Sequence, residues 1–153
     1  MARPQREDWA AALIAADAGK VAALAAAITA RAKATPLAPP REGLMLMQLR
    51  DSVAGKPFHL GEIPVTQVHL RLNGPEGLAE GGAVLMSDDL PRATAIAVLD
   101  AALAADWPEA PAIEALIAEG QAARSNTNAD RALVLERTKV DFKLLSEADD
   151  DNA

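Results

Sequence analysis

The chain contains no cysteine, and only 3% of its 153 residues are aromatic. Without cysteine it can form no disulfide and can supply no thiolate nucleophile, no Cys-ligated zinc site and no cysteine-held iron–sulfur cluster. Any chemistry of those kinds in which the protein takes part must therefore belong to a partner.

Basic clusters and long apolar runs are also missing. The 15 lysines and arginines are outnumbered by 22 acidic residues, for a net charge of -7, which repels phosphate backbones. No uncharged apolar stretch approaches the roughly 18 residues that a membrane span requires, and Glu7, Asp8 and Asp17 bracket the one segment that could imitate a signal peptide. We therefore expect a cytoplasmic protein that binds neither nucleic acid nor membrane.

What the chain has in abundance is alanine. Hydrophobic residues make up 50% of the sequence, but much of that share is alanine, which offers one methyl group to a core. Since apolar burial contributes about 25 cal/mol per Å², such a core leaves little margin over chain entropy, and a permanent partner would supply the missing area. We expect a single domain at residues 1–146, obligately associated, followed by a disordered acidic tail at residues 147–153.

Apolar periodicity and turn residues predict an α+β fold. Its parts are an N-terminal helical hairpin, an antiparallel meander of about four strands, and C-terminal helices packed on one face. Prolines 36, 39 and 40 predict a linker or an edge strand, and Asp88 or Asp89 is expected to cap the helix that begins near Pro91. The predicted helices are residues 6–18 and 20–34, broken near Gly19, then 90–106, 112–123 and 129–145; the predicted strands are 44–49, 58–72 and 83–86.

Three details of this scheme leave alternatives open. Residues 44–47 and 83–86 are apolar at successive positions, so these strands are either central in the sheet or completed by another chain. In contrast Val68, Leu70 and Leu72 alternate with polar residues, which predicts one buried and one solvated face. The polar run at residues 125–128 predicts a break between the last two helices, and residues 139–144 alternate, so an extended arm there is the alternative to helix.

No catalytic motif emerges from the spacing of polar residues. His59, Glu62 and His69 are the residues most like a metal set, but positions ten apart on a continuous strand are separated by about 33 Å, and a bulge at Gly61 would be needed to bend it. The glycines at 74, 77, 81 and 82 lead into a strand, which favours a hairpin turn over a phosphate-binding loop.

Two further residues have a structural and a functional interpretation. Asp100 falls on the apolar side of its helix, where a carboxylate requires a partner; we favour a bond to neighbouring backbone or to a partner's arginine over catalysis. Trp9 is either a core residue or a binding hot spot, and we favour the core.

Several segments together resemble a known family. They are the helix with Trp9, the segment Phe58-x-Leu60-Gly61-Glu62-x-x-Val65-Thr66, the glycine turn, the helix with Asp100, and the closing Thr138-Lys139-Val140-Asp141-Phe142. This order resembles the PhnG family, the G subunit of the bacterial carbon–phosphorus lyase core complex, over nearly the whole chain. One departure is Met86-Ser87-Asp88 where a Gly-Arg pair is expected, which puts in doubt any partner contact made by that arginine; the prolines at 36, 39 and 40 are another.

The resemblance implies a structural role in phosphonate catabolism. Members assemble with the H, I and J subunits into a twofold-symmetric hetero-oligomer, with the I subunit the most direct partner. The complex forms a ribose 1-phosphonate 5-triphosphate from ATP and a phosphonate, displacing adenine. The resemblance implies that zinc, the iron–sulfur cluster and S-adenosylmethionine belong to partner subunits, and that the quoted residues, Trp9, Phe58, Gly61, Glu62, Thr66, Asp100 and 138–142, serve structure or partner binding.

Two other function classes stay open on the sequence. One is a small autonomous enzyme that uses Glu62, Asp100 or the histidines in a cleft of its own. The other is a helical adaptor without a link to phosphonates.

Overall fold

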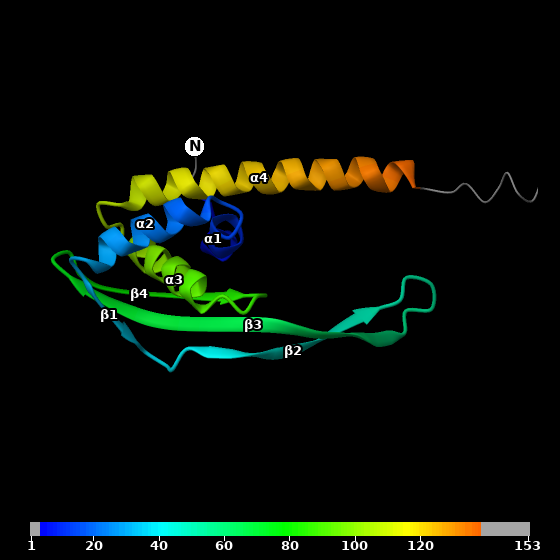
Figure 1. The fold of residues 1–153 in the computed structure, drawn as a ribbon, viewed down its shortest axis with the longest axis horizontal. Coiled ribbons are helices and arrows are strands. Elements are labelled where there is room, and N and C mark those ends of the chain that lie inside the picture. Colours follow the sequence, from blue (N-terminus) through cyan, green and yellow to red (C-terminus); the bar gives the residue numbers. More distant parts are fainter. Residues whose placement is uncertain (1–3, 139–153) are drawn as a thin grey trace, which may run out of the picture.

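A computed structural model describes residues 4–138 of the chain (Figure 1). The α+β prediction is confirmed: two N-terminal helices precede a four-stranded antiparallel sheet, and two helices follow it. The elements in chain order are α1 (Arg6–Leu13), α2 (Ala18–Thr29), β1 (Lys33–Pro36), β2 (Arg41–Arg50), β3 (Pro57–Gly74), β4 (Gly77–Leu85), α3 (Leu90–Ala104) and α4 (Ala110–Arg137).

The elements form layers on one side of the sheet. Helix α3 lies directly against β3 and β4, with α1 and α2 beside it, and α4 runs across the far side of this helical layer, mainly on α1 (Figure 1). The other face of the sheet carries no described element. Buried Val68, Leu70 and Leu72 of β3 point to the helices, so the predicted alternation is confirmed.

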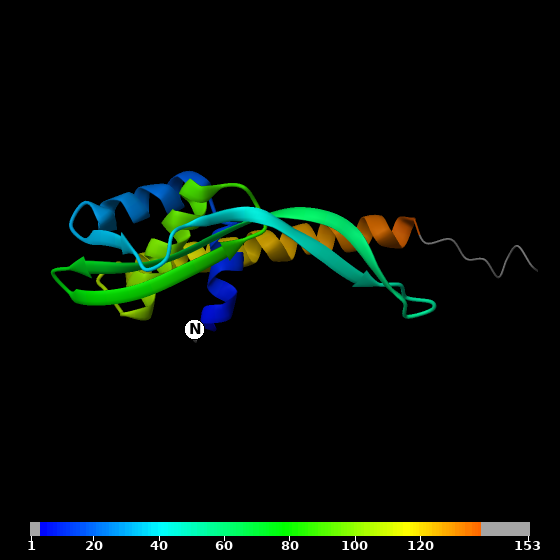
Figure 2. The same cartoon turned by 90° about the horizontal axis from the view of Figure 1, so that it is seen from below.

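The sheet is organised around β3, which is 18 residues long. Along one edge of β3, β2 pairs with residues 57–67 and β1 with residues 70–73; along the other edge, β4 pairs only with Thr66–Gly74. Residues 57–65 of β3 and their partners on β2 therefore form a two-stranded ribbon that extends beyond the rest of the sheet (Figures 1 and 2). We call this segment, together with Arg41 and Glu42 at its base, the ribbon (residues 41–65).

Small residues bring the layers of the body unusually close. A Cβ placed on Gly81 of β4 would lie 2.3 Å from the amide nitrogen of Ala101 on α3. A Cβ on Gly120 of α4 would lie 1.9 Å from the carbonyl oxygen of Ala12 on α1. The alanine-rich core therefore compensates for short side chains with close backbone approach.

The first helices differ in detail from their predicted bounds. The chain bends by 120° between α1 and α2, and the break lies at residues 14–17 instead of Gly19. Asp17 is the reason: its Oδ1 accepts a hydrogen bond from the amide of Lys20 at 2.9 Å, a cap that starts α2 before the glycine. Residues 33–34, predicted to end the second helix, instead begin the edge strand β1, which the proline cluster had left as an alternative to a linker.

Helix α3 is as predicted in its cap and early proline. Asp89 accepts a hydrogen bond from the amide of Arg92 at 2.9 Å, and Pro91 stands in the first turn, where it costs no backbone hydrogen bond. The helix ends at Ala104, two residues before Asp106, whose φ of 56° turns the chain toward Trp107.

The predicted break at residues 125–128 is wrong, because α4 continues through it as a single helix of 28 residues. Serine, asparagine and threonine cost at most about 0.7 kcal/mol each in a helix, and the run holds no proline or glycine. The hydroxyl of Thr127 also finds a partner within the helix, donating to the carbonyl oxygen of Ala123 at 3.0 Å. The predicted helix end at residues 139–145 and the tail at 147–153 lie outside the described residues.

The two strands that are apolar on both faces are not central. Strands β2 and β4 each pair only with β3, so each presents a free edge within the described part of the chain. Gly61, with φ of 144°, sits at the irregularity in the β2–β3 register, which shifts between Met47 and Gln48; this is the bulge considered from the sequence.

Among residues 4–138, no single helix is long and apolar enough to cross a membrane. The pair α1 and α2 meets the criteria of length and composition when taken together, despite the 120° bend between the two helices.

Candidate partner interface

The ribbon exposes large apolar side chains that a solvated hairpin would not carry. Leu44 is 66% exposed, Leu46 55% and Leu60 63%. A two-stranded hairpin with solvent on both faces is marginally stable at best, and apolar side chains on it add a further cost of hydration. The other large hydrophobic residues exposed on or at the tip of the ribbon are Met45, Leu49, Val53 and Phe58. The ribbon therefore has the composition of a surface that another element covers.

The strand register assigns these residues to faces. Leu44 lies opposite Pro64 and Leu46 opposite Glu62, while Glu42 lies opposite the buried Thr66. Residues paired across two strands share a face, so these side chains occupy the face that, further along β3, packs against the helices. The covered face of the sheet thus continues uncovered onto the ribbon.

The C-terminal half of α4 is a second exposed extension. Every described residue from Arg124 onward is exposed, and the apolar run Leu133, Val134 and Leu135 is 60–70% exposed. We call residues 121–137 the α4 arm. The arm and the ribbon extend past α1–α3 in the same direction, as both views of the fold show (Figures 1 and 2).

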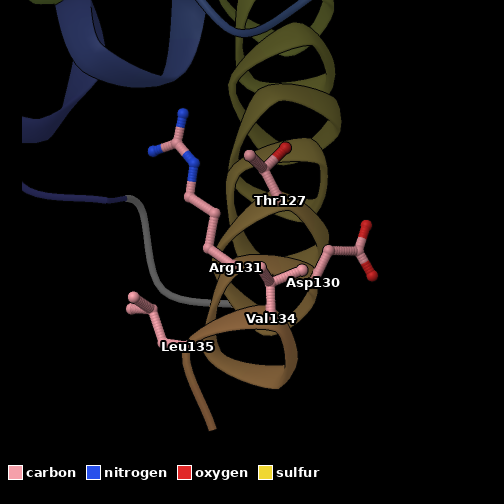
Figure 3. Close-up of a pocket in the computed structure, with 5 residues that line it drawn as sticks. All are labelled: Thr127, Asp130, Arg131, Val134 and Leu135. Atoms are coloured by element: carbon pink, nitrogen blue, oxygen red, sulfur yellow. The ribbon is translucent and has the colours of Figure 1, made fainter. Parts of the chain in front are cut away.

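A hollow of about 450 Å³ lies on the α4 arm, but it lacks the form of an active site. Its lining residues, Thr127, Asp130, Arg131, Val134 and Leu135, all come from this one helix. Figure 3 shows Arg131 and Leu135 extending to one side of the helix and Asp130 to another. A catalytic cleft requires groups that converge from several elements, whereas a hollow on one exposed helix is typical of a surface that receives a partner.

Asp100, the buried carboxylate noted in the sequence, joins three elements of the body. Its Oδ2 accepts hydrogen bonds from Nη2 of Arg6 at 2.7 Å and from the amide of Gly82 at 3.0 Å, and its Oδ1 accepts one from Nε of Arg6 at 3.0 Å. The same Nη2 also donates to the carbonyl oxygen of Glu80. Hydrogen bonding to Asp100 raises the pKa of Arg6 above its usual value. The arginine that pairs with Asp100 therefore comes from its own chain.

Two other residues singled out in the sequence also lie in the body. Trp9 is 4% exposed within the core, and its indole Nε1 donates to the carbonyl oxygen of Pro4 at 2.9 Å. Thr66 is fully buried, and its hydroxyl donates to the carbonyl oxygen of Ser87 at 2.7 Å, which ties β3 to the turn before α3. Their contacts are those of residues that hold the domain together.

The remaining residues of the resemblance lie on the extensions. Phe58, Gly61 and Glu62 belong to the ribbon, and Thr138 is the C-cap of α4. Lys139, Val140, Asp141 and Phe142 lie outside the described residues. The structure thus distributes the motif residues between the body and the two projecting surfaces instead of gathering them in one cleft.

His59, Glu62 and His69 are all exposed on β3. In the described part of the chain, no group of three or more histidines and carboxylates is placed so that it could hold a metal ion.

A second charged cluster fixes the opposite end of the body. Arg31, after α2, donates to both carboxylate oxygens of Glu109 at 2.6 Å and also bonds Glu76 in the β3–β4 turn. Its guanidinium lies 5.5 Å from the ring centroid of the buried Trp107. Hydrogen bonding to Arg31 lowers the pKa of Glu76. This cluster anchors the start of α4 and so sets the direction of the arm.

Sequence reasoning missed the α4 arm as a surface, because it divided the helix at residues 125–128. The available signal was helical spacing: Arg124 and Arg131 follow Ile117 at intervals of seven, on the helix face that is buried earlier in α4.

Comparison with known proteins identifies the family. A search among curated proteins gives no significant match. The family model described as "Phosphonate metabolism protein PhnG" matches residues 4–146, which is nearly the whole chain. The ribbon, the α4 arm and the body that carries them all fall within the matched region, and the chain belongs to the PhnG family of phosphonate metabolism proteins.

Proposed function

We propose that this protein is a structural subunit of a cytoplasmic carbon–phosphorus lyase complex, assembled with H, I and J subunits into a twofold-symmetric hetero-oligomer. The complex would form a ribose 1-phosphonate 5-triphosphate from ATP and a phosphonate with release of adenine. In this proposal the chain supports the catalytic subunits and does not itself carry out the transfer.

The observation that carries the proposal is the pair of uncovered apolar extensions on a member of this family. Leu44 and Leu46 of the ribbon and Val134 and Leu135 of the α4 arm are all more than half exposed. Exposed apolar patches rimmed by charge are typical of surfaces that associate with another protein. A permanent partner would also add the buried area that the alanine-rich body lacks.

The chemistry of the chain supports a non-catalytic role. Both oxygens of Asp100 accept hydrogen bonds from within the protein, so this carboxylate is engaged in holding the fold. The chain has no cysteine with which to ligate an iron–sulfur cluster. In the proposed division of labour, zinc, the iron–sulfur cluster and S-adenosylmethionine bind to partner subunits.

The test is an adenine-release assay with ATP and methylphosphonate. We expect no turnover by the purified chain, none by the H, I and J subunits prepared without it, and turnover when all four are co-expressed. Adenine release by the isolated chain would instead identify it as an enzyme. Full turnover without the chain would remove it from the active assembly.

A further inference from the structure

The layers of the fold end at different places along the molecule. In the body, the helical layer of α1, α2 and α3 lies between α4 and the sheet. Further along, the α4 arm and the ribbon both continue, while no described element lies between them (Figures 1 and 2). The two outer layers, α4 and the sheet, thus extend beyond the end of the helical layer that lies between them in the body.

The face of α4 that contacts the body continues along the arm and there faces the space between the arm and the ribbon. Ile113, Ile117 and Gly120 are buried, and Gly120 approaches Ala12 of α1. Successive helix residues are rotated by about 100° around the axis, which places Arg124 and Arg131 within about 40° of these buried positions. Leu135 lies on the same face of the helix. Figure 3 shows Arg131 and Leu135 on a common side of the helix. The arm therefore directs two cations and an apolar residue toward the missing layer.

The ribbon presents a complementary surface from below. Its helix-side face carries Leu44 and Leu46 together with the carboxylates of Glu42 and Glu62, as the register with β3 requires. All four residues are exposed. The missing layer is therefore bounded by cations and apolar groups on one side and by carboxylates and apolar groups on the other.

These charges have no partners in the described structure. Among residues 4–138, Arg124, Arg131, Glu42 and Glu62 form no ion pair and no side-chain hydrogen bond with one another or with other residues. In the body, by contrast, Arg6, Lys20, Arg31 and Arg71 are all paired with carboxylates. Charges left unpaired beside apolar residues favour a partner of opposite charge pattern.

We infer that a helical segment of a partner subunit occupies the space between the α4 arm and the ribbon and completes the middle layer. This inference rests on the proposed function. The segment is apolar on two opposite sides, because it meets Leu44 and Leu46 on one side and Leu135 on the other. It carries carboxylates toward Arg124 and Arg131 and basic residues toward Glu42 and Glu62. A helix fits because the layer that it continues is itself helical.

The absence of native cysteine allows a direct test by single-cysteine photocrosslinking. Leu46→Cys on the ribbon and Leu135→Cys on the arm would each carry benzophenone maleimide in the chain co-assembled with H, I and J subunits. Mass spectrometry should locate both crosslinks on one helical segment of one partner. Leu78→Cys is the matched control and should not label that segment: Leu78 is 65% exposed, and it lies on β4 opposite Asn73, at the end of β3 away from the ribbon.

Charge reversal provides a second measurement on the same assembly. The double change Arg124→Glu and Arg131→Glu should weaken partner binding about tenfold or more, while Arg137→Glu on the opposite side of α4 should change it much less. Equal effects of the two changes would overturn the inference. It would also be overturned by crosslinks to a second copy of this chain, or to segments of two different partners.

The outcomes separate the two proposals. If the wild-type chain fails to assemble with the three subunits, the proposed function fails and the inference fails with it. If it assembles but Leu46→Cys and Leu135→Cys label unrelated segments, only the inference fails.

Discussion

Arg6 of α1 and Asp100 of α3 are 94 residues apart in the sequence and form a two-point ion pair, with nitrogen–oxygen distances of 2.7 and 3.0 Å. The pair also binds the edge strand β4. Asp100 accepts a hydrogen bond from the amide of Gly82, and Arg6 donates one to the carbonyl oxygen of Glu80. Asp100, for which the sequence favoured a structural bond over catalysis, thus joins two helices to an edge strand.

Replacing Asp100 with alanine should lower the free energy of unfolding by about 1–3 kcal/mol, because the amide of Gly82 and the guanidinium of Arg6 lose their acceptor. Urea denaturation of the purified protein measures this. Arg71→Ala, which breaks the exposed pair with Glu80, is the matched control and should cost about 1 kcal/mol or less.

A double-mutant cycle tests whether the effect belongs to the pair. Arg6→Ala and Asp100→Ala together should cost clearly less than the sum of the single changes. Additive costs would show that the two side chains stabilise the fold independently.

Gly120→Ala should separate α4 from α1. The added methyl would lie 1.9 Å from the carbonyl oxygen of Ala12, which is backbone and cannot move aside as a flexible side chain would. We expect a loss of about 1–3 kcal/mol in unfolding free energy, even though alanine is the better helix former. Gly43→Ala, where a Cβ meets nothing within 4 Å, is the control; a neutral Gly120→Ala would contradict the close contact.

The pair between Lys20 and Glu119 should make stability depend on pH in a defined window. Hydrogen bonding to Lys20 lowers the pKa of Glu119 in the folded protein. The contribution of Glu119 to the free energy of unfolding is therefore present above the unfolded pKa, near 4.3, and is lost as pH falls through the folded pKa. Hydrogen bonding to Glu119 raises the pKa of Lys20 in the folded protein. The contribution of Lys20 to stability is therefore present below its unfolded pKa, about 10.4, and is lost as pH rises through the folded pKa.

Melting curves of wild type and Glu119→Gln measure this dependence. The difference in Tm between them should be largest from about pH 5 to pH 10 and should shrink on both sides of that window. A difference that stays constant from pH 2 to pH 7 would mean that the carboxylate charge of Glu119 does not contribute. High salt should reduce the difference, because the pair is exposed.

Asn126→Pro should disconnect the α4 arm from the body. Proline inside a helix removes one backbone hydrogen bond and clashes with the preceding turn, at a cost of about 3 kcal/mol or more. Because the residues that follow make no core contacts, we expect the melting of the body to change little while assembly with the other subunits is lost. Asn126→Ala should preserve assembly. Normal assembly of Asn126→Pro would exclude the arm as a binding surface.

Much of the body could be predicted from local signals. The Asp89 cap, Pro91 and the alternation at Val68, Leu70 and Leu72 are encoded within a few residues of each element. The course of α4 could not be predicted in the same way. The polar residues at 125–128 weaken a helix without stopping it, and whether the helix continues depends on the summed propensity of the long segment around them.

The two projecting surfaces were harder to predict, because their exposure depends on which neighbouring elements end first. The apolar character of Leu44 and Leu46 indicated that β2 would be covered, but not whether a neighbouring strand or another chain would cover it. The register ends β4 opposite Thr66 and leaves residues 57–65 of β3 with β2 as their one neighbouring strand in the described part of the chain. Long-range pairing of this kind leaves little trace in local periodicity.

The most direct test of the structural role is light scattering on a sizing column, with the chain alone and co-expressed with the H, I and J subunits of its own genome. We expect one stoichiometric particle that contains all four proteins. A stable monomer that elutes apart from those three subunits would contradict it.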